Sequence, residues 1–287
     1  LLEGTERPLS FEELGMSEEM RRVLTENLSK SYGMVLVTGP TGAGKTTTLY
    51  SFLSILNKPE VNVTSVEDPI EYNIPRVNQI QINPQAGITF VSGLRAILRQ
   101  DPNVVMVGEI RDSETANIAV QAALTGHLII SSLHTNDAPT AIPRLVDLKT
   151  PPFLIASVLN LVLAQRLVRR ICPVCVYSYP ITDEVKKIIA NQLTGQDIND
   201  RRIPRVLYRG KGCETCGRTG YKGRLGIYEF LEVKDKIKEE IANPGFSLDK
   251  LRDLAKEAGM KTMFEDGLLK VQLAVTTIEE VLRVIRE

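Results

Sequence analysis

The sequence has no tryptophan, only two histidines and only four cysteines, and its charges cancel. Thirty-five Lys and Arg residues stand against 35 Asp and Glu residues, so the formal net charge is zero. This balance argues against a protein that binds nucleic acid mainly by releasing counterions, because such domains usually carry a basic excess. It does not exclude a local basic patch.

Long hydrophobic runs are also missing. The longest nearly apolar stretch, residues 155–164, is interrupted by Ser157 and Asn160 and is far shorter than the roughly 20 residues that a membrane span needs. We therefore expect no segment that crosses a bilayer. The chain begins Leu1-Leu2-Glu3, without a Met or the basic and apolar regions of a signal peptide, and we expect it to be a fragment of a longer protein.

The residues that are present suit a soluble globular protein of 287 residues, 43% of them apolar, with room for two domains. Short apolar runs at 34–38, 63–66, 104–107 and 128–132 alternate with helical patterns at 45–56, 92–100, 113–125 and 137–148. Buried strands that alternate with helices are typical of a parallel α/β sheet. Within residues 71–82, the alternation Gln79-Ile80-Gln81-Ile82 predicts an inserted β-hairpin.

The composition changes after about residue 170, where prolines and glycines punctuate a segment with little periodicity. From residue 234 the pattern is helical again. These changes predict a core at 1–170, a small loop-rich module at 171–231 and a helical part at 232–287.

Residues 39–46 fit the phosphate-loop pattern G-x-x-x-x-G-K-[ST], between a predicted strand and a predicted helix. The glycines let backbone N–H groups converge on a phosphate at the positive end of the helix dipole. Lys45 would bring its charge to the β- and γ-phosphates, and Thr46 would hold Mg²⁺. ATP is favoured over GTP because no Asn-Lys-x-Asp guanine signature occurs. The predicted nucleotide-binding residues are Gly39, Pro40, Thr41, Gly42, Ala43, Gly44, Lys45, Thr46 and Thr47.

Hydrolysis of the nucleotide also requires a carboxylate near the metal and a group that positions the attacking water. Two predicted strands end in acids. One is followed by Gly108-Glu109, which is the layout of a Walker B element with Glu in the usual Asp place, and the other ends at Glu67-Asp68. Acids at strand ends are often ordinary surface residues, but the preceding phosphate loop favours a functional role here.

The two histidines, His127 and His134, flank one predicted strand. Most histidines are ordinary core or surface residues. His134, however, follows the carboxyl end of its strand, at the edge where open α/β sheets bind ligands. We therefore predict that the polar residues gathered there sense the γ-phosphate; they are Ser131, Ser132, His134, Thr135 and Asn136.

Arginines cluster near the predicted Walker B element, with Arg95 and Arg99 on one helix face and Arg111 two residues after Glu109. They either form ordinary ion pairs on a solvated face or reach the nucleotide of a neighbouring subunit and stabilise charge on the transferring phosphoryl group. The sequence alone leaves both interpretations open.

All four cysteines fall in two C-x₂-C pairs, Cys172 with Cys175 and Cys213 with Cys216. Such pairs are typical of a Cys₄ zinc site, in which each pair directs two thiolates at one metal. Disulfides would need an oxidising compartment, which an ATPase without a signal peptide would not occupy. A zinc site with all four positions filled by protein is structural.

The zero net charge is a sum of unlike parts. Residues 164–230 carry 13 Lys and Arg against 6 Asp and Glu, and the other residues carry 22 against 29. The basic module is a candidate docking face for an acidic protein or an anionic membrane surface, and it keeps a nucleic-acid partner open. The arginines that we single out are Arg201, Arg202, Arg205 and Arg209.

Taken together, these motifs resemble the assembly ATPases of type II secretion and type IV pilus systems, the GspE/PilB type. The matching segments are residues 38–50 (Walker A), 66–72 (Asp box), 93–102 with 108–112 (Walker B region), 124–136 (His box), 164–169, the two C-x₂-C pairs and 219–224. The resemblance covers essentially the whole chain. It departs at residues 147–152, where the family usually has a turn containing Met-Gly.

The resemblance implies a RecA-like P-loop NTPase core, a tetracysteine zinc module and a helical C-terminal part. It also implies a homohexamer that is peripheral to the cytoplasmic face of the inner membrane. That ring would bind cytoplasmic domains of the platform and anchor proteins of the system, and no nucleic acid is expected.

By matching positions, the resemblance implies that Glu67 is the catalytic carboxylate and that Glu109 is the Walker B acid, which holds Mg²⁺ with Thr46. It adds His127 and His134 of the His box to the catalytic set. The candidates for phosphate contact within or between subunits are Arg95, Arg99, Arg111 and Arg144.

The implied cofactors are ATP, Mg²⁺ and Zn²⁺, and the implied function is ATP hydrolysis that drives pilin or pseudopilin assembly. One alternative is a nucleic-acid motor, such as a helicase or conjugation ATPase, that grips its substrate with the zinc module. Another is a zinc interaction module on an inactive P-loop.

Overall fold

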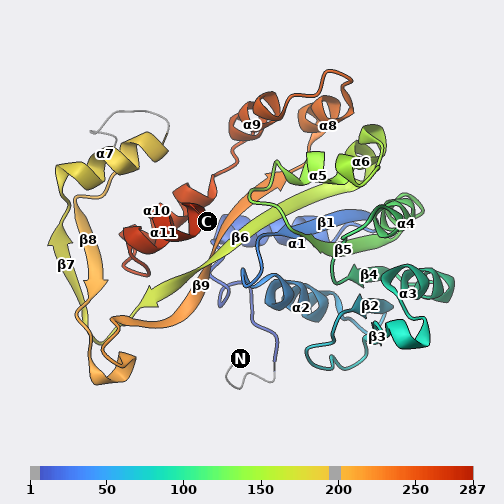
Figure 1. The fold of residues 1–287 in the computed structure, drawn as a ribbon, viewed down its shortest axis with the longest axis horizontal. Helices are drawn as coiled ribbons and strands as arrows, with labels where there is room; N and C mark the ends of the chain where they lie inside the picture. Colours follow the sequence, from blue (N-terminus) through green and yellow to red (C-terminus); the bar gives the residue numbers. More distant parts are fainter. Residues whose placement is uncertain (1–6, 194–201, 287) are drawn as a thin grey trace. The chain divides into compact units, whose positions relative to one another are not determined.

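The computed structural model describes residues 7–193 and 202–286 (Figure 1). The chain forms two compact units, and each combines two stretches of sequence. The first unit is Leu1–Gln165 with Phe230–Met260, and the second is Arg166–Glu229 with Lys261–Glu287. This division differs from the three consecutive segments predicted, because the strands β6 (Leu159–Ile171) and β9 (Tyr221–Glu232) each begin in one unit and end in the other.

The core strands of the first unit are buried along their whole length, as their apolar sequences predict. They are β1 (Gly33–Thr38), β2 (Val63–Glu67), β4 (Val104–Val107) and β5 (Leu128–Leu133). The predicted strands and the parallel α/β class are confirmed. The helices of this unit are α1 (Glu18–Leu28), α2 (Lys45–Leu56), α3 (Phe90–Ile97), α4 (Ser113–Leu124), α5 (Ala141–Asp147), α6 (Pro152–Val158), α8 (Asp235–Ala242) and α9 (Leu248–Glu257), with 3₁₀ turns η1 (Pro84–Ala86) and η2 (Leu98–Gln100).

The predicted β-hairpin at residues 71–82 is wrong. The segment contributes one short strand, β3 (Asn78–Gln81), which pairs with β2 in parallel. Alternating Gln and Ile residues do indicate a partly buried strand, but the pattern carries no information about the direction of the neighbouring strand. After β2 the chain returns to the amino-terminal side of the sheet before β3 begins, instead of reversing direction in a tight turn.

The sheet order is β3-β2-β4-β5-β1-β6-β9. Strands β3, β2, β4, β5, β1 and β6 all pair in parallel with their neighbours. Their carboxyl ends therefore meet at one edge, which we call the carboxyl edge. Open α/β sheets bind ligands in the crevice outside this edge.

The second unit contains more regular structure than its glycines and prolines suggest. A two-stranded antiparallel sheet joins β7 (Val176–Pro180) to β8 (Val206–Gly210). Helix α7 (Asp183–Gln192) lies between them in sequence, and α10 (Met263–Gln272), α11 (Ile278–Arg286) and the 3₁₀ turn η3 (Glu214–Cys216) complete the unit. The predicted helical C-terminal part is confirmed, although its four helices are divided between the two units. No helix in the described ranges is long and apolar enough to cross a membrane.

Candidate nucleotide site and tetracysteine centre

The phosphate loop connects β1 to α2 at the carboxyl edge. Gly42 and Gly44 have φ angles of +81° and +86°, a conformation that side chains with a Cβ rarely adopt. Gly44 is the N-cap of α2 and offers no capping side chain, and the first turn of the helix has no acidic residue. The amides at this helix end are thus left to an anionic ligand, which fits the predicted phosphate site.

Lys45 lies across the loop. Its Nζ donates hydrogen bonds to the carbonyl oxygens of Gly39, at 2.9 Å, and Pro40, at 3.1 Å. The ammonium group is therefore already held beside the loop amides, where it would meet the β- and γ-phosphates. Thr46, in the first turn of α2, is exposed and free of helix-core packing, as a Mg²⁺ ligand requires.

A buried glutamine braces the loop from β6. The Gln165 Nε2 donates to the carbonyl oxygen of Ala43 at 2.6 Å, and its Oε1 accepts a hydrogen bond from the Thr48 hydroxyl at 2.8 Å. Gln165 is only 1% exposed. Reasoning from the sequence missed this contact, and the one signal for it was the position of Gln165 at the end of a long apolar run.

Glu67 ends β2, two strands from β5 in the sheet order, and its side chain is nearly buried at 2% exposure. Its Oε1 accepts hydrogen bonds from Ser65 Oγ at 2.5 Å and from Gln79 Nε2 at 3.0 Å, and its Oε2 accepts one from the Tyr50 hydroxyl. None of these three donors was predicted. These three hydrogen bonds hold the carboxylate in one defined place at the carboxyl edge.

Glu109 follows β4, the strand between β2 and β5. Its carboxylate forms an ion pair with Arg111 and lies 3.3 Å from His134 Nε2. The hydrogen bond to Glu109 raises the pKa of the Arg111 guanidinium. The structure thus brings together three residues that the sequence singled out, at the same edge as Glu67 and the phosphate loop.

The other candidates lie elsewhere. His127 precedes β5, and its carbonyl oxygen accepts a hydrogen bond from the Gly33 amide at the start of β1, so it lies at the edge opposite the phosphate loop. Within one chain this position does not favour the catalytic role predicted for His127. Arg95 pairs with Glu114 of α4 at 2.9 Å, and the side chains of Arg99 and Arg144 are exposed. Contacts of these arginines with a neighbouring subunit stay predictions.

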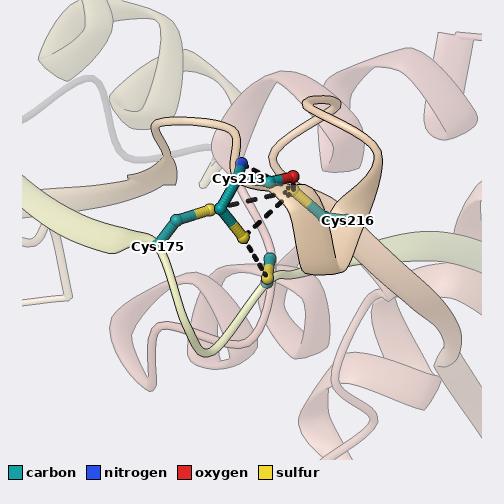
Figure 2. A group of neighbouring side chains, drawn as sticks. Cys175, Cys213 and Cys216 are labelled. Atoms are coloured by element: carbon teal, nitrogen blue, oxygen red, sulfur yellow. Dashed lines mark hydrogen bonds between the residues drawn. The ribbon is translucent and has the colours of Figure 1, made fainter.

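The four cysteines of the second unit form one cluster, as predicted, with all Sγ atoms within 4.8 Å of one another. The Sγ–Sγ distances are 3.8 Å between Cys172 and Cys213, 3.9 Å between Cys175 and Cys216, and 3.7 Å between Cys213 and Cys216. Four thiolates about 2.3 Å from a central Zn²⁺ in a tetrahedron would lie roughly 3.8 Å apart. Figure 2 shows Cys175, Cys213 and Cys216 with their sulfur atoms turned towards one another.

Backbone amides support this geometry. Cys216 Sγ accepts hydrogen bonds from the N–H groups of Cys213, at 3.2 Å, and Gly220, at 3.3 Å. The bond from Cys213 contributes most to lowering the pKa of the Cys216 thiol to about 6. Burial raises the pKa of the Cys175 thiol to about 11, so the fit to a structural Cys₄ zinc site rests on the arrangement of the four sulfur atoms.

Two arginines of the predicted basic patch are neutralised by acids of the C-terminal helices. Arg202 pairs with Glu265 at 3.0 Å, and Arg209 pairs with Glu279 at 2.7 Å. Arg205 is exposed, and Arg201 lies outside the described residues. The patch is thus less basic than its sequence count suggests.

Comparison with known proteins agrees with the geometry of the nucleotide site. The model of the family described as "Type II/IV secretion system protein" matches residues 1–283. The chain belongs to this family. The resemblance inferred from the motifs is confirmed.

Individual relatives come from both kinds of system. The chain is 49% identical to "Type IV pilus assembly ATPase PilB" of Thermus thermophilus over 272 residues, which is 95% of this chain and 30% of the relative. It is also 49% identical to "Type II secretion system protein E" of Pseudomonas aeruginosa over 287 residues, which is 100% of this chain and 55% of the relative. The chain thus spans about half or less of these relatives.

Among solved structures, the pilus retraction motor PilT with bound ADP matches with a TM-score of 0.71 at 27% identity, over 98% of this chain and 68% of that one. This likeness confirms the α/β ATPase fold of the described chain.

Proposed function

We propose that the chain is a Mg²⁺-dependent ATP hydrolase whose turnover drives assembly of pilin or pseudopilin subunits, in type IV pilus extension or type II secretion. The observation that carries this proposal is the convergence of the phosphate loop, Glu67 and Glu109 at one sheet edge. Membership of the family and the names of its relatives support the same conclusion.

Each residue has a distinct task in the proposed reaction. Lys45 and the loop amides bind the phosphates, while Thr46 and Glu109 would hold Mg²⁺, which neutralises charge that develops on the transferring phosphoryl group. Glu67 orients the attacking water and accepts its proton. The contact of His134 with Glu109 supports a role for His134 in sensing the γ-phosphate.

The assembled form that we propose is a homohexamer at the cytoplasmic face of the inner membrane, bound to platform and anchor proteins of the system. The exposed side chains of Arg99 and Arg144 support contacts with a neighbouring subunit. The tetracysteine centre would keep the second unit folded as a rigid contact surface.

The variant Glu67→Gln tests the catalytic assignment. It keeps the size of the side chain but removes the proton acceptor, so we expect ATP hydrolysis to fall at least about a hundredfold while ATP binding stays nearly intact. Glu71→Gln is the matched control, because it makes the same change at an exposed residue four positions further on. Unchanged steady-state hydrolysis by Glu67→Gln would overturn the role of Glu67.

Addition of single- or double-stranded DNA at physiological salt separates this function from that of a nucleic-acid motor. We expect no change in the rate of ATP hydrolysis. Strong stimulation would favour the translocase instead.

A further inference from the structure

The side chain of Tyr50 lies next to the proposed catalytic carboxylate and belongs to α2, the helix that follows the phosphate loop. Tyr50 is fully buried, at 0% exposure. Its hydroxyl forms a hydrogen bond with Glu67 Oε2. The two other donors to Glu67, Ser65 and Gln79, come from the sheet strands β2 and β3 and bind the other oxygen.

The direction of the Tyr50 bond follows from the chemistry of its two partners. An ionised carboxylate can only accept hydrogen bonds, so the single proton of the Tyr50 hydroxyl is directed at Glu67. The hydroxyl oxygen in turn accepts a hydrogen bond from the backbone N–H of Glu71 at 3.0 Å. Burial, and then the bond to Glu67, raise the pKa of Tyr50, so the hydroxyl stays protonated and remains a donor.

Helix α2 also connects Tyr50 to the predicted nucleotide-binding residues. It lies five residues after Lys45 on α2, which is roughly 7.5 Å along the helix axis. The first turn of that helix carries Lys45 and Thr46. A helix is stiff over this length, so any shift of its phosphate-binding end is passed to the hydroxyl that holds Glu67.

From this geometry we propose that Tyr50 is a positioning residue that couples the phosphate-binding end of α2 to the Glu67 carboxylate. Ser65 and Gln79 hold Oε1 from the sheet, and Tyr50 holds Oε2 from the nucleotide-binding helix. Glu67 thus adopts its place for water activation only when α2 is correctly seated. The inference rests on the proposed function, because it assumes that Glu67 acts on the attacking water.

The variant Tyr50→Phe removes the hydroxyl and keeps the ring. We expect kcat to fall about tenfold or more, as for one lost hydrogen bond to an ionised group, with the dissociation constant for ATP changed less than about twofold. Tyr72→Phe is the matched control. The Tyr72 ring packs against Tyr50 at a centroid distance of 4.5 Å, and within the described chain no hydrogen bond joins its hydroxyl to Glu67. It should keep the wild-type kcat.

The double variant Tyr50→Phe/Glu67→Gln separates positioning from general structural damage. If Tyr50 acts through Glu67, its removal costs no further rate in single turnover once Glu67 is already Gln. An additional tenfold loss in that background would overturn the proposal, and so would wild-type kcat in Tyr50→Phe alone. Weakened ATP binding in Tyr50→Phe would also overturn it, because the tyrosine would then support the loop and not the carboxylate.

These outcomes are distinguishable from failure of the proposed function. If Glu67→Gln hydrolyses ATP at the wild-type rate, the catalytic assignment fails and the positioning role fails with it. If Glu67→Gln is inactive and Tyr50→Phe is fully active, only the positioning role fails.

Discussion

Glu280 gives a prediction with a magnitude that follows from the structure of the second unit. Its side chain is 2% exposed and accepts four hydrogen bonds, two from the backbone N–H and guanidinium of Arg169 and two from the guanidinium of Arg283. Burial on its own raises the pKa of this carboxyl group. The hydrogen bonds from Arg283 and Arg169 outweigh burial and lower the pKa from 4.5 to about 2.

A pKa that is lower in the folded state than in the unfolded state means that the ionised Glu280 carboxylate stabilises the fold. A change of about 2.5 pH units corresponds to about 3 kcal/mol of folding free energy. The two arginine side chains are 50% and 44% exposed, and solvent screening reduces the expected contribution to about 2 kcal/mol. The variant Glu280→Gln should lose about this much free energy of unfolding at pH 7.

The dependence on pH has a fixed sign. Because the folded-state pKa of Glu280 is below the unfolded-state value, its contribution is complete above about pH 4.5 and is lost as the pH falls towards about 2. The difference between wild type and Glu280→Gln should therefore be largest near neutral pH and shrink towards zero in acid.

The assay is urea unfolding followed by circular dichroism, for wild type and variant at each pH. Glu279→Gln is the control, because Glu279 is 53% exposed and pairs with the half-exposed Arg209, so its loss should cost less than about 1 kcal/mol. Equal stability of the two variants would refute the reasoning. A difference between wild type and Glu280→Gln that stays constant down to pH 2 would refute it as well.

Two further predictions concern the tetracysteine centre and the loop brace. One zinc per chain should be found by elemental analysis, and Cys213→Ser should lose the metal together with the folded signal of the second unit, whereas a metal-free, fully folded wild type would contradict the assignment. Gln165→Leu removes the hydrogen bond to the Ala43 carbonyl of the phosphate loop and the one from the Thr48 hydroxyl of α2, and leaves both groups without that partner. Its ATP affinity, measured by equilibrium binding, should fall about tenfold, and unchanged affinity would exclude the bracing role.

Local spacing alone was enough to predict several features correctly. The buried strands are recognisable because each is a short apolar run between turn residues, and the phosphate loop because its glycines and Lys45 occupy fixed offsets between a strand and a helix. The grouping of the two C-x₂-C motifs into one cluster follows from zinc chemistry, because one pair supplies only two of the four ligands of a closed site. For the strands and the phosphate loop, the determining contacts are between residues close in sequence. For the cysteine pairs, the motif itself requires a second pair.

What the sequence did not provide are contacts between segments far apart in the chain. Two donors to Glu67 come from other elements, Tyr50 from α2 and Gln79 from β3, and nothing in the local pattern of either residue marks it as a partner. The same holds for Gln165, which lies 122 residues after the Ala43 carbonyl that it binds.

The two histidines show the distinction most simply. His127 and His134 belong to one sequence box, but they precede and follow the same strand, so the parallel sheet places them at opposite edges. Strand direction already indicated that His134 lies at the ligand-binding edge, and the pairing of β5 with β4 then brings it to Glu109. Sequence therefore determined which chemical groups this protein carries, and the tertiary structure determined which of them act together, because strand order and direction set distances that no local pattern encodes.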